Sequence, residues 1–117
     1  MSFVRKQADQ ICGEKQVFGG NGTAKMHQIL NGAEELGGKG RLFNQVFLEP
    51  GCEIGWHIHH GDNETYYILS GKGEFNDNGT IVEVNPGDVT FTDDGEGHAM
   101  KAIGDETLVM IALILYN

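Results

Sequence analysis

Two histidines one residue apart, followed by a glutamate, are the residues of this 117-residue sequence best suited to bind a metal. His57 and His59 lie in the stretch GWHIHHGDNETYY. Strand side chains alternate between two faces, so both imidazoles are expected to point the same way. If the next four residues close an antiparallel hairpin, His59 lies opposite Glu64 and His57 opposite Tyr66, with paired Cβ atoms about 4.5–5.5 Å apart. This spacing predicts two imidazoles and a carboxylate around one small volume, which is the beginning of a metal site.

The composition indicates one folded domain. With 117 residues, 39% of them hydrophobic, the chain is long enough to bury one core. Its 18 glycines and 2 prolines suit short strands joined by tight turns. The net charge of −9 opposes binding to nucleic acid or anionic lipid. The sequence lacks an apolar run of membrane-spanning length and a signal-peptide core, so we expect no membrane partner and a cytoplasmic location.

The two cysteines, Cys12 and Cys52, are far apart in the sequence. In a reducing compartment we expect two free thiols without a chemical role. A metal-binding or reactive Cys52 is the alternative.

Strand patterns dominate from residue 41 onward. Apolar and aromatic runs between turn signals predict strands at 42–49, 54–59, 64–69, 72–75, 80–84, 88–92, 98–103 and 107–116. Asn78-Gly79 suits the positive φ values of a two-residue hairpin turn. The last run, TLVMIALILY, is almost continuously apolar, which predicts burial on both faces. The predicted fold class is all-β, with two packed antiparallel sheets in a jelly-roll sandwich or barrel.

The first 40 residues are weakly patterned. A strand at 23–30 and a glycine-rich loop at 31–40 are the elements that we expect there. We expect residues 1–40 to form an arm that packs on the barrel or on a second subunit, and residues 41–117 to form the barrel domain. This arm, the apolar last strand and Trp56 predict a homodimer.

A further histidine, His98, opens a strand after a polar loop, and local geometry alone does not place it beside the other two. The pattern G-x5-H-x-H-x4-E-x6-G of Gly51–Gly71 resembles the first motif of the cupin superfamily in every position. Residues 87–102 resemble the second motif in the glycines and the histidine. They differ at Asp93 and Ala102, where cupins usually have a proline and an asparagine.

The resemblance implies a cupin-type jelly-roll β-barrel that binds one divalent transition metal. The implied ligands are His57, His59, Glu64 and His98. Three imidazoles and one carboxylate suit Fe, Mn, Ni, Cu or Zn. Four protein ligands leave up to two coordination positions open, unlike a closed structural zinc site. The alternative is a ligand set that is unoccupied or only structural.

Side chains in phase with the ligands are expected to line a substrate pocket or to belong to the barrel core. They are Tyr66, Ile68, Phe91 or Thr92, Met100, and Met110 or Val109. Tyr66 is the candidate catalytic residue, because a buried tyrosine hydroxyl usually needs a partner. The mouth loops contain Asp62, Asn63 and Asp93, which we expect to be solvated, and Trp56 and Ile58 fall on the opposite face, where they would pack between sheets or at an interface.

Within residues 51–102 no lysine or arginine shares the face of the histidines, which disfavours sugar phosphates, since these need cationic groups. A small, partly apolar molecule that offers an oxygen or carboxylate to the metal is the expected partner. The first functional hypothesis is a metalloenzyme, dioxygenase- or decarboxylase-like, with isomerase and lyase chemistry also open. The second is a non-catalytic small-molecule-binding or sensor cupin. A stabilising metal in a scaffold is the third.

Overall fold

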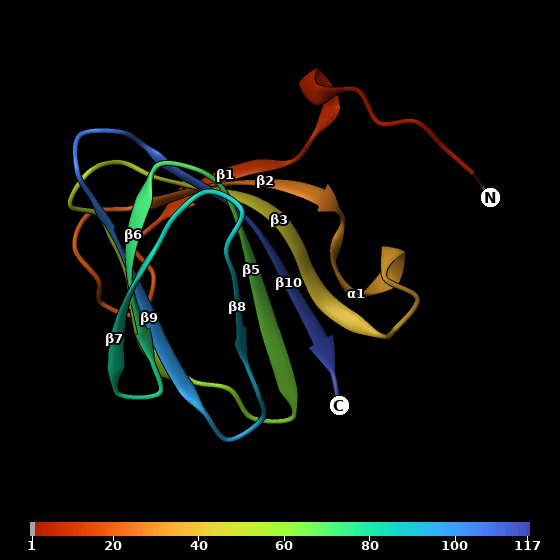
Figure 1. Ribbon diagram of the computed structural model, residues 1–117. Helices are drawn as coiled ribbons and strands as arrows, with labels where there is room; N and C mark the ends of the chain where they lie inside the picture. Colours follow the sequence, from red (N-terminus) through yellow and green to blue (C-terminus); the bar gives the residue numbers. More distant parts are fainter. Residues whose placement is uncertain (1) are drawn as a thin grey trace.

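The protein is described by a computed structural model covering residues 2–117, and antiparallel strands in two facing sheets make up most of it (Figure 1). One sheet has the order β1-β2-β3-β10-β5-β8 and the other β4-β9-β6-β7. The strands are β1 (Cys12–Lys15), β2 (Ala24–Leu30), β3 (Gly40–Leu48), β4 (Glu53–Ile58), β5 (Asp62–Ser70), β6 (Lys72–Asp77), β7 (Thr80–Val84), β8 (Val89–Thr92), β9 (Gly97–Ile103) and β10 (Leu108–Tyr116). The predicted all-β fold with two antiparallel sheets is confirmed.

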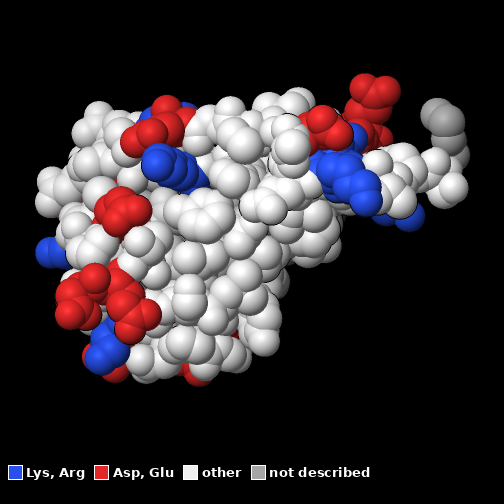
Figure 2. Space-filling model, turned by 90° about the horizontal axis from the view of Figure 1, so that it is seen from above, with Lys and Arg blue, Asp and Glu red and all other residues white. Residues whose placement is uncertain are grey.

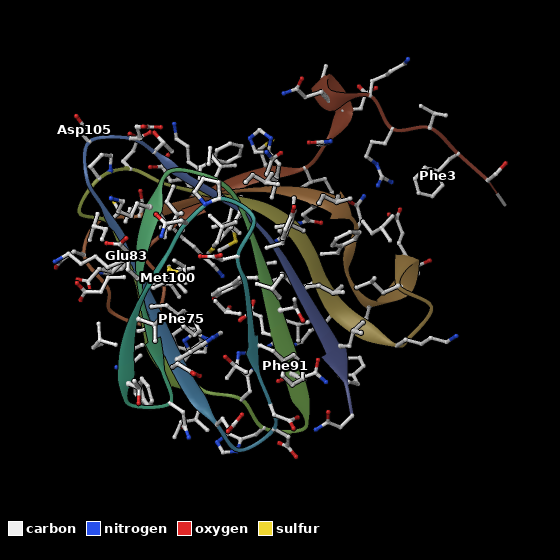
Figure 3. All side chains as sticks on the ribbon, viewed as in Figure 1. Phe3, Phe75, Glu83, Phe91, Met100 and Asp105 are labelled. Atoms are coloured by element: carbon white, nitrogen blue, oxygen red, sulfur yellow. The ribbon has the colours of Figure 1, made fainter. Side chains whose placement is uncertain are left out.

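The core lies between the two sheets. Leu108 and Met110 of β10 are fully buried, and so is Leu48 of β3. From the four-stranded sheet, Phe75 and Met100 point into the same space (Figure 3). Residues 108–114 of β10 alternate between buried and half-buried, so the inner face of this strand is in the core and its outer face is only partly covered.

Each strand predicted between residues 23 and 116 is present within a few residues of its expected bounds. The turn between β6 and β7 is also confirmed, with φ values of 49° at Asn78 and 106° at Gly79. The sequence did not predict β1, the 3-10 helix η1 (Gln7–Asp9) or the short helix α1 (Gly32–Glu35), which lies in the expected glycine-rich loop. All four residues of β1 are exposed, so this strand has no alternating hydrophobic pattern to reveal it.

The predicted hairpin between residues 54–59 and 64–69 is wrong. Strand β4 pairs with β9 in the four-stranded sheet, whereas β5 pairs with β10 and β8 in the six-stranded sheet. The loop between β4 and β5 therefore crosses from one sheet to the other. Glu64 lies opposite Thr92 and Ile114 in the strand register, and not opposite His59.

The first 40 residues add strands to the larger sheet. Strand β2 pairs with β3 along most of its length, and β1 forms the edge beyond β2. Figure 1 shows η1 and the N-terminal segment extending away from the barrel beyond β1. Residues 12–30 are thus close enough to the barrel to help shape any cavity inside it.

Seen from above, acidic and basic side chains stand together in small groups, and a broad central area has neither (Figure 2). The excess of acidic residues is therefore not gathered into one patch on this face. Among residues 2–117, no helix is long and apolar enough to cross a membrane.

Candidate metal centre

The structure brings together the four side chains expected as ligands. One ligand atom from each of His57, His59, Glu64 and His98 lies within 4.8 Å of the others. His57 and His98 are direct partners in the pairing of β4 with β9. The register shifts between Ile54 and His57, and such a bulge re-aims a side chain. Glu64 comes from β5 in the opposite sheet, so the ligands converge across the barrel.

The distances between the ligand atoms match those around a single ion. His98 Nε2 lies 3.0 Å from His57 Nε2, 3.1 Å from His59 Nε2 and 3.0 Å from Glu64 Oε1. Glu64 Oε1 lies 3.1 Å from His59 Nε2 and 4.0 Å from His57 Nε2. Ligands about 2.1 Å from an ion are about 3.0 Å apart at right angles and about 4.2 Å apart when opposite. These five distances lie in the range expected for ligands of one ion.

Each imidazole uses its Nδ1 for a hydrogen bond directed away from the cluster: His57 to Gly55 O at 2.9 Å, His59 to Asp62 Oδ1 at 2.7 Å and His98 to Thr92 Oγ1 at 2.7 Å. The Gly55 carbonyl and the Asp62 carboxylate accept these hydrogen bonds, and the Thr92 hydroxyl can accept in the same way. The Nε2 lone pairs then face one another and the carboxylate. A cation among them removes their mutual repulsion, so the residues fit a divalent metal.

The charge states of the cluster also suit a cation. Burial alone would raise the pKa of Glu64, but hydrogen bonds with His59 and His98 outweigh it and lower this pKa to about 2. The hydrogen bond with Glu64 raises the pKa of His59, against the effect of burial. Burial lowers the pKa of His57, which favours its neutral form. A metal ion entering the cluster therefore meets a carboxylate and competes with a proton at His59.

Asp62 and Arg41 support the cluster from behind His59, and the sequence did not reveal this role. Arg41 Nε donates to Asp62 Oδ2 at 2.9 Å, while Asp62 Oδ1 accepts from His59. The expectation of a solvated Asp62 is wrong, because the residue is only 5% exposed. Burial would raise the pKa of Asp62, but the hydrogen bonds from Arg41 and His59 lower it, so the carboxylate stays charged. The sequence signal for this contact is the position of an acidic residue, Asp62, three residues after His59.

The loop before His98 supports His59 through its backbone. His59 N donates to Glu96 O at 3.0 Å, and Gly95 N donates to His59 O at 2.7 Å. Asp93, at the position where cupins usually have a proline, holds the loop through its own N–H, which donates to Glu96 Oε1 at 3.0 Å.

A cavity of about 160 Å³ opens beside three of the four ligands, His57, His59 and Glu64. Its walls also include Lys15, Val17, Phe18, Met26, Arg41, Leu42, Val46, Ile54, Tyr66, Ala112 and Ile114. Of the expected pocket residues, Tyr66 lines it. Ile68, Met100 and Met110 lie in the buried core, outside the lining of this cavity. The expectation for Phe91 is wrong, because its side chain is 53% exposed on β8, where odd-numbered side chains point outward.

The cationic residues of this cavity come from outside the range that the sequence pattern covers. Lys15 ends β1 and Arg41 lies near the start of β3, and both line the cavity. Together with Met26 and Leu42 they also line a groove of about 390 Å³ over β1, β2 and β3. The mouth of the cavity therefore carries positive charge that comes from outside residues 51–102.

Comparison with known proteins agrees with this geometry. Residues 44–114 match the model of the Cupin domain family. The chain is a cupin. It is 43% identical over 97 residues to the oxalate-binding protein of Thermotoga maritima, covering 83% of this chain and 79% of that protein.

Solved structures resemble this cupin along nearly its whole length. A crystal structure described as a predicted oxalate decarboxylase from Thermotoga maritima has a TM-score of 0.92 and 37% identity, covering 98% of this chain and 100% of that one. A polyketide cyclase from Streptomyces resistomycificus has a TM-score of 0.76 and 17% identity, covering 99% of this chain and 80% of that one, and shows the fold alone.

Tyr66 is a buried tyrosine beside the cluster of His57, His59, Glu64 and His98. The residue is 2% exposed, and its ring lies parallel to that of His98, with centroids 5.1 Å apart and planes 11° apart. Burial raises the pKa of Tyr66 well above its usual value, and the charge on Glu64 raises it further. Tyr66 therefore presents a neutral phenol to the cavity at physiological pH.

Trp56 and Ile58 point away from the ligands, as expected for the alternate residues of β4. They are 46% and 47% exposed, so the expectation that they pack between the sheets is wrong. Trp56 instead lies across Gly97 of β9, where a side chain would collide with the indole ring.

Proposed function

We propose that this cupin binds one divalent transition metal through His57, His59, Glu64 and His98, and that the metal binds oxalate or a similarly small carboxylic acid. The observation that supports this most directly is the convergence of the four ligand atoms, which lie within 4.8 Å of one another beside a small cavity. Four protein ligands leave up to two positions for carboxylate oxygens. The relatives named for oxalate support this choice of acid.

Charge and size of the cavity support a small anion. Lys15 and Arg41 line it although the chain has a net charge of −9. Asp62 compensates part of the charge of Arg41, and Lys15 offers positive charge to a carboxylate. Its volume of about 160 Å³ is small, since pockets for drug-sized ligands occupy about 300–1,000 Å³. Apolar walls from Val46, Ala112 and Ile114 limit the water inside, which strengthens each electrostatic contact there.

A bound divalent ion supplies Lewis acidity, which draws electron density from carboxylate oxygens. The residues of the chain have separate tasks around it. The three histidines and Glu64 hold the ion, Asp62 fixes the ring of His59, and Lys15 and Arg41 attract the acid. Tyr66 keeps its proton and can donate a hydrogen bond into the cavity.

Catalysis at the same metal, decarboxylase- or dioxygenase-like, is the second candidate function. The observation that favours it is Tyr66, a neutral phenol that lines the cavity beside Glu64. Such a group can hold or deliver a proton where a substrate reacts. The binding step is common to both candidates, and product formation separates them.

The decisive experiment uses the purified protein with its metal content measured by elemental analysis. The Mn²⁺-loaded protein is titrated with oxalate by calorimetry, and ¹³C-labelled oxalate is followed by NMR while oxygen uptake is recorded. Binding with release of unchanged oxalate supports the binding function, and labelled formate or CO₂ or oxygen uptake supports catalysis. Stoichiometric metal without binding or turnover of oxalate or related acids refutes both and leaves a structural metal.

We also propose a homodimer, based on the outer face of the six-stranded sheet. Four apolar or aromatic residues are neighbours on this face in the register of β3, β10 and β5: Phe43, Ile111, Leu113 and Tyr67. Of these, Tyr67 is 45% exposed. Large exposed apolar patches mark association surfaces. Light scattering at micromolar concentration should give twice the chain mass, and Ile111→Lys should give a monomer. A wild-type monomer contradicts this part of the proposal.

A cytoplasmic location completes the proposal. Cys12 and Cys52 are both free thiols, the first exposed and the second partly buried. Free thiols are typical of reducing compartments. Fractionation of the source cells, with thiol labelling of each fraction, tests this; recovery outside the cytoplasm contradicts it.

A further inference from the structure

Phe18 forms an aromatic wall of the metal cavity, although it lies outside both cupin motifs. Its ring is parallel to the imidazole of His57, with centroids 4.0 Å apart and planes 9° apart. The ring lines the cavity, yet the residue is 63% exposed. One side of the ring thus covers a metal ligand and much of the rest meets solvent. Core packing does not account for a large apolar side chain in such a position.

The backbone holds Phe18 in a conformation that residues other than glycine rarely adopt. Its φ is 49°, in the left-handed region, which persists only where surrounding contacts fix it. Val17, just before it, is buried and forms a parallel bridge with Ile54 of β4. The carbonyl of Val17 accepts hydrogen bonds from Gly20 N at 3.1 Å and from Gly55 N at 3.0 Å. Beyond the ring, the carbonyl of Asn21 accepts a hydrogen bond from Glu53 N of β4 at 2.8 Å, so the loop is fastened to β4 on both sides of Phe18.

Gly55 connects this loop directly to the metal ligand. Its lack of a side chain is needed, because a Cβ there would collide with the carbonyl oxygen of Phe18. The same residue accepts the hydrogen bond from His57 Nδ1 at 2.9 Å. The imidazole of His57 is thus held at its edge by Gly55 and at its face by Phe18.

We propose that Phe18 is a positioning and specificity-determining residue of the metal site. Its ring keeps the imidazole of His57 in the plane that directs Nε2 at the metal. The same ring closes one side of the cavity and limits it to acids of about the size of oxalate. The second statement rests on the proposed function, whereas the first needs only that the four residues bind a metal.

The positioning role is tested with Phe18→Gly and Phe18→Ala. Glycine accepts a φ of 49° without strain, so Phe18→Gly removes the ring and leaves the loop its shape. Phe3→Ala, which removes another exposed aromatic ring, is the control. Loss of one aromatic stacking contact should weaken Co²⁺ binding about 2-fold to 10-fold in chelator competition. The visible spectrum of bound Co²⁺, which reports ligand geometry, should change in both Phe18 variants. Unchanged affinity and spectrum in a folded Phe18→Gly protein overturn the positioning role.

The specificity role is tested by comparing oxalate, malonate and succinate on the Co²⁺-loaded proteins by calorimetry. The wild type should prefer oxalate, and Phe18→Gly should lower the oxalate-to-succinate affinity ratio by about 10-fold or more, as expected when a wall that excludes extra methylenes is removed. This ratio is independent of how much metal each protein retains, provided that only the loaded fraction is counted. An unchanged ratio overturns the specificity role. If the wild type binds none of the three acids, the proposed function fails, while the Co²⁺ data still decide the positioning role.

Discussion

Replacing Asp62 by asparagine should weaken metal binding although Asp62 does not touch the metal. Its carboxylate accepts a 2.7 Å hydrogen bond from His59 Nδ1 and a 2.9 Å hydrogen bond from Arg41 Nε. Both donors meet a buried negative charge, so both bonds are charge-assisted and stronger than neutral ones. The variant Asp62→Asn has nearly the same shape, and its amide oxygen can still accept from His59. Its NH2 group then faces Arg41 Nε, so the charge and the hydrogen bond from Arg41 are both lost.

The magnitude follows from two opposing effects. A hydrogen bond to a charged group contributes about 1.5–3 kcal/mol and a neutral one about 0.5–1.5 kcal/mol, so the loss at His59 is about 1–1.5 kcal/mol. Loss of the carboxylate also lowers the pKa of His59, which Asp62 helps to raise, and this reduces the competition from protons. The first effect dominates toward pH 8, because protons compete less for His59 in either protein as the pH rises. We expect affinity to fall about 10-fold there, at the low end of the 10–100-fold typical for groups behind a metal ligand.

The assay is chelator competition with Zn²⁺ or Mn²⁺ at pH 8 and at pH 6. Asp105→Asn, a change of the same kind in the turn before β10, should leave the affinity unchanged. The loss in Asp62→Asn should be smaller at pH 6 than at pH 8, because the lower pKa of His59 compensates more in acid. Equal affinities of wild type and Asp62→Asn at pH 8 would refute the reasoning that links Asp62 to the metal through His59.

Three further predictions follow from the same site. Glu64→Gln should reduce bound metal below one-tenth of the wild-type content, since it replaces an anionic ligand with a neutral one, and elemental analysis after dialysis measures this. In the metal-free protein, Glu64 has a folded pKa of about 2, below the ordinary 4.5. The contribution of Glu64 to the free energy of unfolding is therefore complete above pH 4.5 and is lost as the pH falls toward 2. At neutral pH it is at most about 3 kcal/mol, and urea unfolding at pH 7 and pH 3 should show a loss that Glu64→Gln lacks. Gly55→Ala should push the Phe18 loop away from β4 and weaken Co²⁺ binding by more than Phe18→Gly does; an affinity equal to wild type in the same competition assay contradicts it.

The sequence predicted the elements well where local patterns decide them. Strands β6 and β7 join at Asn78-Gly79, whose φ preference is a local property. The ligand set came from a motif resemblance. The sequence did not reveal how these ligands meet in space. His57 and His98 are 41 residues apart in the sequence and become neighbours only through the pairing of β4 with β9.

The wrong expectations all concern contacts between segments that are separated in the sequence, which local patterns do not reveal. A four-residue loop between two strands does not reveal whether they pair or pass to different sheets, and β4 and β5 do the latter. Likewise, Lys15 and Phe18 lie in an exposed segment without hydrophobic periodicity, so no pattern connects them to the cavity that they line. The expectation of a solvated Asp62 rests on the usual solvation of acidic loop residues, whereas here the ion pair with Arg41 makes the burial of Asp62 possible.

Because the chain crosses from one sheet to the other between β4 and β5, a metal bound at this site would stabilise the packing of the two sheets. His57 and His98 belong to the four-stranded sheet and Glu64 to the six-stranded sheet, so an ion bound by all of them would link the two sheets. An ion that binds only the folded state stabilises it by an amount that grows with the logarithm of the free metal concentration. The separation of the layers on unfolding is thereby coupled to metal supply. Starvation for the metal would show first as faster proteolysis of this protein and then as loss of its ligand binding.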